Sequence, residues 1–198
     1  HYKLLQGELS SLWNTSEIRL YWGLLAGVIV VILVGTVVGG IGLAEGLTEE
    51  RVRTAAFQAA SLLTSTGYGT RSISSDYFPL VARPLFLMLM FVGGSVGSTA
   101  GGVKVLRVTV LIQGIKRELK KLYTPRRAVQ PLLIDGMIVP ADEITRVVSL
   151  FFAWLVYVFG AGVITLLFSS HGLLGSFSAP LSMVGNMGPS FLPPGATA

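Results

Sequence analysis

The sequence contains no cysteine and few charged residues. The absence of cysteine among its 198 residues excludes disulfide bonds and cysteine-based metal or redox centres. Charged residues make up 13% of the chain and hydrophobic residues 52%, and the mean hydropathy of +0.69 is far too high for an ordinary soluble domain. The composition therefore favours a protein that lies in a membrane.

Histidine is also scarce, and the common enzyme motifs do not fit. His1 and His171 are far apart and no acidic cluster accompanies them, so a metal-dependent enzyme is not expected. Gly97 starts a run with the spacing of a phosphate-binding loop, but Val103 stands where that loop requires lysine and no strand is expected before it. We therefore expect that the protein is not an enzyme.

Two long runs carry no charge, and they cover residues 21–43 and 147–169. Each would form a helix of roughly 34 Å, long enough to cross a hydrocarbon core of about 30 Å. The first run starts too late and is too long for a signal peptide. We expect both to be transmembrane spans.

A third apolar region, at residues 78–114, is interrupted by the glycine-rich stretch GGSVGSTAGG at 93–102. Five glycines in this stretch oppose a regular helix. Within a membrane, a broken backbone is tolerated only where it is buried in protein or lines a water-filled cavity. The break therefore indicates a transport path.

Basic residues predict the orientation of the chain. Eight of them lie between positions 104 and 127: Lys104, Arg107, Lys116, Arg117, Lys120, Lys121, Arg126 and Arg127. The positive-inside rule places this stretch and the N-terminal segment in the cytoplasm, and the loop at 45–83 outside. We interpret the basic run as a topology signal that contacts lipid headgroups, not nucleic acid, because no aromatic residues are interleaved with it. The glycosylation sequon at Asn14 would face the cytoplasm, so it is dismissed.

A short helix is expected at residues 49–63, followed by the polar turn TSTGYG at 64–69. Its length of about 20 Å is too short to span, so it is predicted to be a re-entrant pore helix. The negative end of its dipole would face the membrane centre and favour a cation. Glycine would let successive carbonyls turn towards one axis, as in a potassium selectivity filter. An ordinary extracellular turn remains the alternative on composition alone.

The same order of elements occurs a second time. After the run at 147–169 comes a short apolar element at 171–181, and a glycine-containing stretch follows at 182–189. The chain therefore contains an internal repeat whose second copy stops before its last span. The fold class that we expect is an all-α membrane protein of repeated span–pore helix–span units, like potassium channels, with re-entrant pore helices and a broken intramembrane helix.

Three segments, STGYGT, GGSVGSTAGGVKVLR and VGNMGPS, resemble the potassium-uptake membrane subunits of the Trk/Ktr/HKT superfamily, most closely the TrkH branch. The linker RRAVQPLLIDGMIVP also resembles that branch, and its Asp135-Gly136 pair predicts a tight hairpin turn. Such proteins have four repeats around one pore. The resemblance implies a cytoplasmic linker at 1–20, a third repeat at 21–124, a second linker at 125–141, and a fourth repeat at 142–198 without its last span. We expect a piece of a longer protein.

The resemblance also implies functional residues. The filter would consist of Ser65, Thr66, Gly67, Tyr68 and Gly69 in the third repeat and of Met183, Val184, Gly185, Asn186 and Met187 in the fourth. Potassium would bind at Thr66, Gly67, Val184 and Gly185, with Gly67 and Gly185 as the central glycines. An intramembrane gating loop would contain Gly93, Gly94, Ser95, Gly97, Ser98, Thr99, Gly101, Gly102 and Lys104. We expect hydrogen bonds from Ser95, Ser98 and Thr99 to hold this loop beneath the filter.

The resemblance implies a function and partners as well. Potassium would be the transported ion, carried across the bacterial inner membrane, and no cofactor is expected. The partners would be membrane lipid, a second copy in a homodimer, and a cytoplasmic nucleotide-binding regulatory ring. Two alternatives stay open: a non-transporting membrane scaffold subunit, and a sodium-permeable or sodium-coupled transporter of the same family.

Overall fold

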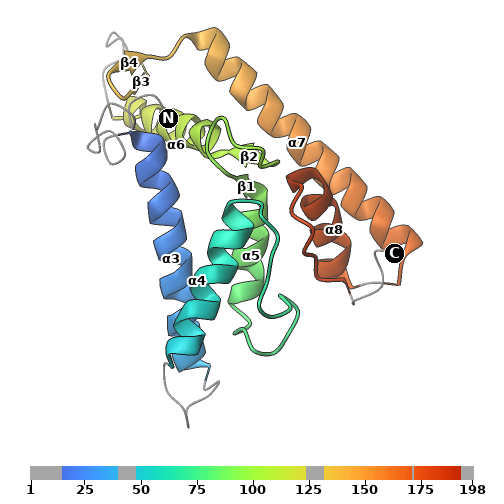
Figure 1. Cartoon of the computed structure of the whole chain (residues 1–198). Helices are drawn as coiled ribbons and strands as arrows, with labels where there is room; N and C mark the ends of the chain where they lie inside the picture. Colours follow the sequence, from blue (N-terminus) through green and yellow to red (C-terminus); the bar gives the residue numbers. More distant parts are fainter. Residues whose placement is uncertain (1–14, 40–47, 124–131, 171, 193–198) are drawn as a thin grey trace.

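The computed structural model describes residues 15–39, 48–123, 132–170 and 172–192. The described residues form six helices (Figure 1): α3 Ser16–Val38, α4 Glu49–Leu63, α5 Ala82–Phe91, α6 Val105–Lys121, α7 Ala141–Phe168 and α8 Leu173–Gly185. Two short strand pairs accompany them: β1 Val92–Gly93 with β2 Val103–Lys104, and β3 Leu133–Ile134 with β4 Met137–Ile138. The predicted all-α fold is confirmed, and so is the break in the third apolar region, because α5 and α6 are separate helices.

The two predicted spans are the long helices α3 and α7. Each is long and apolar enough to cross a membrane, and only 17% of each apolar window is buried. A core helix of a soluble protein would be mostly buried, so these exposed apolar faces favour lipid or further protein as their surroundings. Both helices begin earlier than predicted, at Ser16 and Ala141, because acidic residues such as Glu17 and Asp142 are favourable in a first helical turn.

The largest apolar core lies between α3, α4 and α5. Its fully buried side chains include Ile32 of α3, Leu62 of α4, and Phe86 and Leu89 of α5. Helix α8 packs against α7 and also contacts α5. α7 and α8 approach closely at Gly162, where an added Cβ would lie 2.6 Å from the ring of Phe177.

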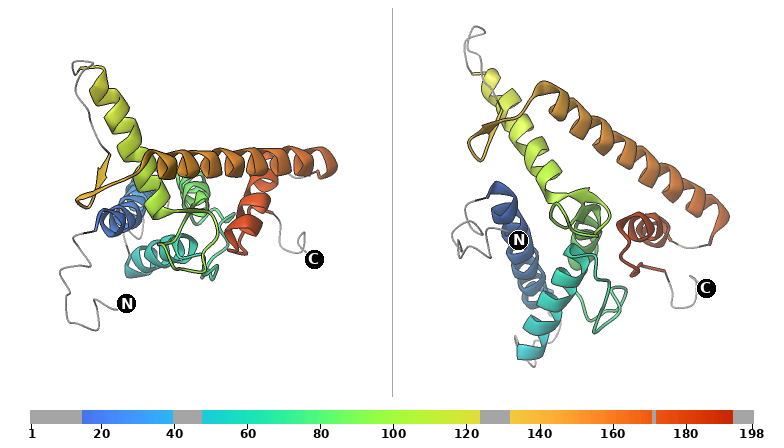
Figure 2. Two further views of the ribbon diagram at one scale, coloured as in Figure 1. Left: turned by 90° about the horizontal axis from the view of Figure 1, so that it is seen from above. Right: turned by 45° about the horizontal axis from the view of Figure 1, so that its top comes forward.

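The ends of the helices segregate to two sides of the molecule. The N-terminus of α3, the β3–β4 hairpin, the C-terminal end of α6 and the start of α7 lie together at the top of Figure 1. Helices α4 and α8 begin at the opposite side and end part of the way across. The segments that charge predicts to be cytoplasmic therefore share one side. Figure 2 shows that α6 leaves the bundle instead of continuing the line of α5.

The hairpin predicted at Asp135-Gly136 is confirmed. Both residues have positive φ, 50° and 81°, and they join the antiparallel strands β3 and β4. A two-residue turn with this pair of angles matches the right-handed twist of the strands. The predictions for His1, Asn14, His171 and the linker residues 1–14 and 124–131 lie outside the described residues, as do those for residues 40–47 and 193–198.

Candidate functional site

Helix α4 has its predicted bounds and ends in a polar turn. After its last residue, Ser65 and Gly67 adopt positive φ angles of 55° and 79°. The backbone N–H of Thr66 donates to the carbonyl of Ser61 at 2.9 Å, and that of Ser65 donates to Leu62 at 3.1 Å. These bonds use carbonyls of the last helical turn of α4. The polar segment that follows therefore lies directly at the negative end of the helix dipole.

A turn of the same shape follows α8. Asn186 and Gly188 have φ angles of 52° and 92°. The N–H of Met187 donates to Ser182 at 3.0 Å, and that of Asn186 donates to Met183 at 3.2 Å. The two turns therefore share the same signs of φ and the same hydrogen-bond pattern. Asn186 corresponds to Ser65, Met187 to Thr66 and Gly188 to Gly67.

This correspondence corrects the register predicted for the fourth repeat. Met183, Val184 and Gly185 lie in the last turn of α8, because this helix continues beyond the predicted end at 181. Gly185 has an ordinary helical conformation, so the glycine that corresponds to Gly67 is Gly188. Asn186 lies in the turn, as predicted.

The two turns lie against each other. A Cβ added to Gly67 would lie 1.7 Å from the carbonyl oxygen of Met187, so any side chain there would collide with the second turn. Gly67, Gly69 and Gly188 line one cavity of about 410 Å³. The side chain of Tyr68 is 73% exposed. The backbones of the two repeats thus form adjoining walls of one site.

Polar atoms without partners lie behind the first turn. Gln58 of α4 is 1% exposed, and its Oε1 atom has no hydrogen-bond partner among the described residues. This oxygen lies 3.0 Å from the position of a Cβ on Gly69. The hydroxyls of Ser61 and Ser65 are also buried without a partner in the described structure. Ordered water commonly satisfies such groups. The sequence prediction missed Gln58, because nothing in the sequence marks this polar side chain as buried.

The predicted loop joins α5 to α6. Strands β1 and β2 pair in parallel and bring the two ends of the loop together. Ser98 donates from its N–H and its hydroxyl to the carbonyl of Ser95, at 3.1 and 2.7 Å. The Nζ of Lys104 donates to the carbonyls of Ser98, at 2.8 Å, and Ala100. Of the three predicted hydroxyl donors, Ser98 is confirmed, whereas no side-chain bond of Ser95 or Thr99 is found in the described part of the chain.

The loop contacts the C-terminal end of α8. The N–H of Gly101 donates to the carbonyl of Gly185 at 3.0 Å. A Cβ on Gly101 would lie 2.1 Å from the carbonyl oxygen of Val184, so only glycine permits this approach. The remaining predicted loop residues lie in the same segment: Gly93, Gly94, Gly97 and Gly102. The loop therefore lies directly beside the helix that carries the second turn.

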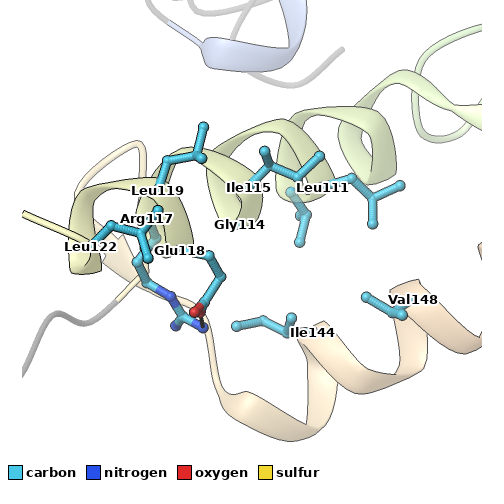
Figure 3. A pocket seen from close by; sticks show the side chains of 10 residues that line it. Leu111, Gly114, Ile115, Arg117, Glu118, Leu119, Leu122, Ile144 and Val148 are labelled. Carbon is cyan, nitrogen blue, oxygen red and sulfur yellow. Dashed lines mark hydrogen bonds and ion pairs between the residues drawn. The ribbon is translucent and has the colours of Figure 1, made fainter.

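An apolar groove of about 510 Å³ lies between α6 and α7 at the side of the basic residues (Figure 3). Leu111, Ile115 and Ile144 line it, and Arg117 and Glu118 lie at its edge. Hydrogen bonds from Lys121 and then Arg117 lower the pKa of Glu118 below its ordinary value.

Two long apolar helices, each followed by a short helix that ends in a positive-φ turn, define an all-α membrane protein of repeated units. The chain belongs to the TrkH family of cation transport proteins, whose family model matches residues 12–196.

Relatives and a solved structure agree with this membership. The chain is 29% identical to the Trk system potassium uptake protein TrkH of Escherichia coli K12, over 96% of this chain and 38% of that protein. It is 35% identical to TrkH of Vibrio parahaemolyticus over 68% of this chain and 27% of that protein. The crystal structure of the potassium transporter TrkH from Vibrio parahaemolyticus matches 90% of this chain and 37% of that one, with 27% identity and a TM-score of 0.78. The chain thus spans well under half of these relatives' length.

Proposed function

We propose that this chain forms one side of a potassium-conducting pore, as the third and part of the fourth of four repeats. The observation that carries the proposal is the contact between two turns of equal backbone conformation, each at the negative end of a short helix. The relatives are potassium uptake proteins, which supports potassium as the transported ion.

The backbone carbonyls of the two turns would replace the hydration shell of the ion. In the third repeat, Thr66 and Gly67 would contribute these carbonyls, as predicted. In the fourth repeat, Met187 and Gly188 would contribute them instead of Val184 and Gly185, a choice supported by the match of their hydrogen bonds and φ angles to those of Thr66 and Gly67. Carbonyl dipoles coordinate a potassium ion without any ionised side chain, which suits a site that must also release the ion.

The loop between α5 and α6 would act as the gate of this pore. Its contact with the end of α8 supports this role, because a movement of the loop would change the space beside the second turn. Movement of α6, whose basic end we place in the cytoplasm, would be transmitted to the loop through Lys104.

The other partners are proposals as well. The groove of Figure 3 combines an apolar lining with nearby basic residues, which fits an anionic lipid whose acyl chain lies along α6. We also propose a homodimer, a cytoplasmic nucleotide-binding ring, and a location in the bacterial inner membrane with the start of α3 in the cytoplasm. The positive charge at one side of the molecule supports this orientation.

Growth and ion uptake test the proposed function. The full-length protein is expressed in cells that lack their own potassium-uptake systems, at limiting potassium. Restored growth with uptake of potassium in preference to sodium is expected. Equal uptake of sodium would favour the sodium-permeable alternative, and no uptake by membrane-inserted protein would favour the scaffold.

A further inference from the structure

A carboxylate at the start of α3 holds the tip of the loop. The Oε1 atom of Glu17 accepts a hydrogen bond from the backbone N–H of Val96 at 2.7 Å, across 79 positions of sequence. The loop backbone at Val96 is neither helical nor paired in a strand. Glu17 therefore supplies the acceptor that local secondary structure does not provide, and hydrogen bonds to carboxylates are stronger than neutral ones.

The same end of α3 is held by the β3–β4 hairpin. Both carboxylate oxygens of Asp135 accept the N–H of Ser16, at 2.9 and 3.2 Å, and one of them accepts its hydroxyl at 2.6 Å. Thr15, the N-cap residue, makes no side-chain capping bond. Asp135 therefore caps the helix from 119 positions away, in place of the usual neighbouring residue.

These contacts surround one cavity. Glu17, Val96, Lys104 and Asp135 are among the residues that line a space of about 720 Å³ between the loop, α6, the hairpin and the start of α7. Through the start of α3, the two polar contacts connect the loop to the hairpin. The inner face of the hairpin packs on α6 and α7, where Ile134 is buried with Val110 and Val147.

We propose that Glu17 and Asp135 are positioning residues that connect the β3–β4 hairpin to the loop, so that a displacement of the hairpin changes the position of the loop. The proposal rests on the proposed gating function. A purely structural role for Glu17, as an acidic residue at a helix start, would affect only the stability of α3. The linkage instead requires an effect on ion flux.

The test measures potassium flux per folded molecule of the full-length protein in liposomes. Glu17→Ala should raise the flux by about tenfold, the factor that corresponds to the lower end of the range for one hydrogen bond to a charged group. Glu17→Gln keeps an acceptor oxygen without the charge, so its flux should lie between those of the wild type and Glu17→Ala. Asp135→Gly removes the cap, suits the positive φ at this position, and should raise the flux in the same direction. The flux of the double variant should be close to that of each single variant, because both changes break the same linkage.

Two references make the outcome decisive. Glu143→Ala removes an acidic residue that lines the same cavity and bonds Arg146 of its own helix, so the flux should not change. Deletion of residues 95–100 reports on the gate itself. A raised flux in the deletion without a raised flux in Glu17→Ala would overturn the linkage but leave the gate. No rise in flux in either the deletion or Glu17→Ala would overturn both the linkage and the gate. A lower yield of folded Glu17→Ala with normal flux per molecule would make Glu17 a structural residue and overturn the linkage.

Discussion

At the scale of single residues, backbone conformation distinguishes the glycines that can shape a filter. Gly67 and Gly188 have φ angles of 79° and 92°, which residues with side chains rarely adopt, whereas Gly185 is helical. Sequence alone could not make this distinction, because VGNMGPS offers two glycines and both fit a turn. The end of α8 depends on a distant contact, the bond from Gly101 to the carbonyl of Gly185.

Serine substitutions at the two candidate glycines test the corrected register. Gly188→Ser in the full-length protein should lower the discrimination of potassium from sodium by about tenfold, because a side chain at this φ costs about 1–2 kcal/mol. Gly185→Ser should have a smaller effect, since the atom nearest to its Cβ would belong to the flexible side chain of Met187, at 3.0 Å. Relative uptake of the two ions is the measurement. The opposite order of effects would restore the register predicted from the sequence.

Gln58 gives a second prediction at this scale. Gln58→Leu keeps the volume in the core but removes the amide that lies behind Gly69, so discrimination between the two ions should fall. The folded protein should be at least as stable, because an unpartnered polar group is lost. Gln113→Leu on α6 makes the same replacement outside the site and is the control. Equal ion discrimination in both variants would show that Gln58 does not position the filter.

At the scale of elements, the sequence predicts those whose limits are set locally. The acidic start of α4 and the polar turn after it gave its bounds correctly, and the Asp135-Gly136 pair gave the hairpin. The glycine-rich stretch predicted the break between α5 and α6. The parallel β1–β2 pair was not predicted, because each strand has only two residues and its partner lies across the loop.

The loop between these helices carries the prediction for this scale. Deletion of residues 95–100 removes both carbonyl acceptors of Lys104 and shortens the segment beside α8. If the loop blocks the pore in its resting position, the flux per reconstituted molecule should rise and no longer depend on the regulatory nucleotide. If the loop is only a packing kink, the deletion should reduce the amount of folded protein and leave the flux of each molecule unchanged or lower.

At the scale of the whole molecule, length and charge predicted the spans and the side on which their connections lie. The structure adds the packing that brings two repeats together: α8 lies between α7 and α5, and its turn meets the turn of α4. Sequence periodicity does not contain this arrangement, because it depends on contacts between residues more than a hundred positions apart. The exposed apolar faces of α3 and α7 leave room for lipid and for further repeats.

The central claim is that the backbone of the two touching turns selects potassium. The most direct measurement is the permeability ratio of potassium to sodium for the full-length protein in liposomes, with and without Gly67→Ser. Because a side chain at Gly67 would meet the carbonyl of Met187, the wild type should favour potassium and the variant should lose about tenfold or more of that preference at equal amounts of folded protein. An unchanged ratio in Gly67→Ser would contradict the account.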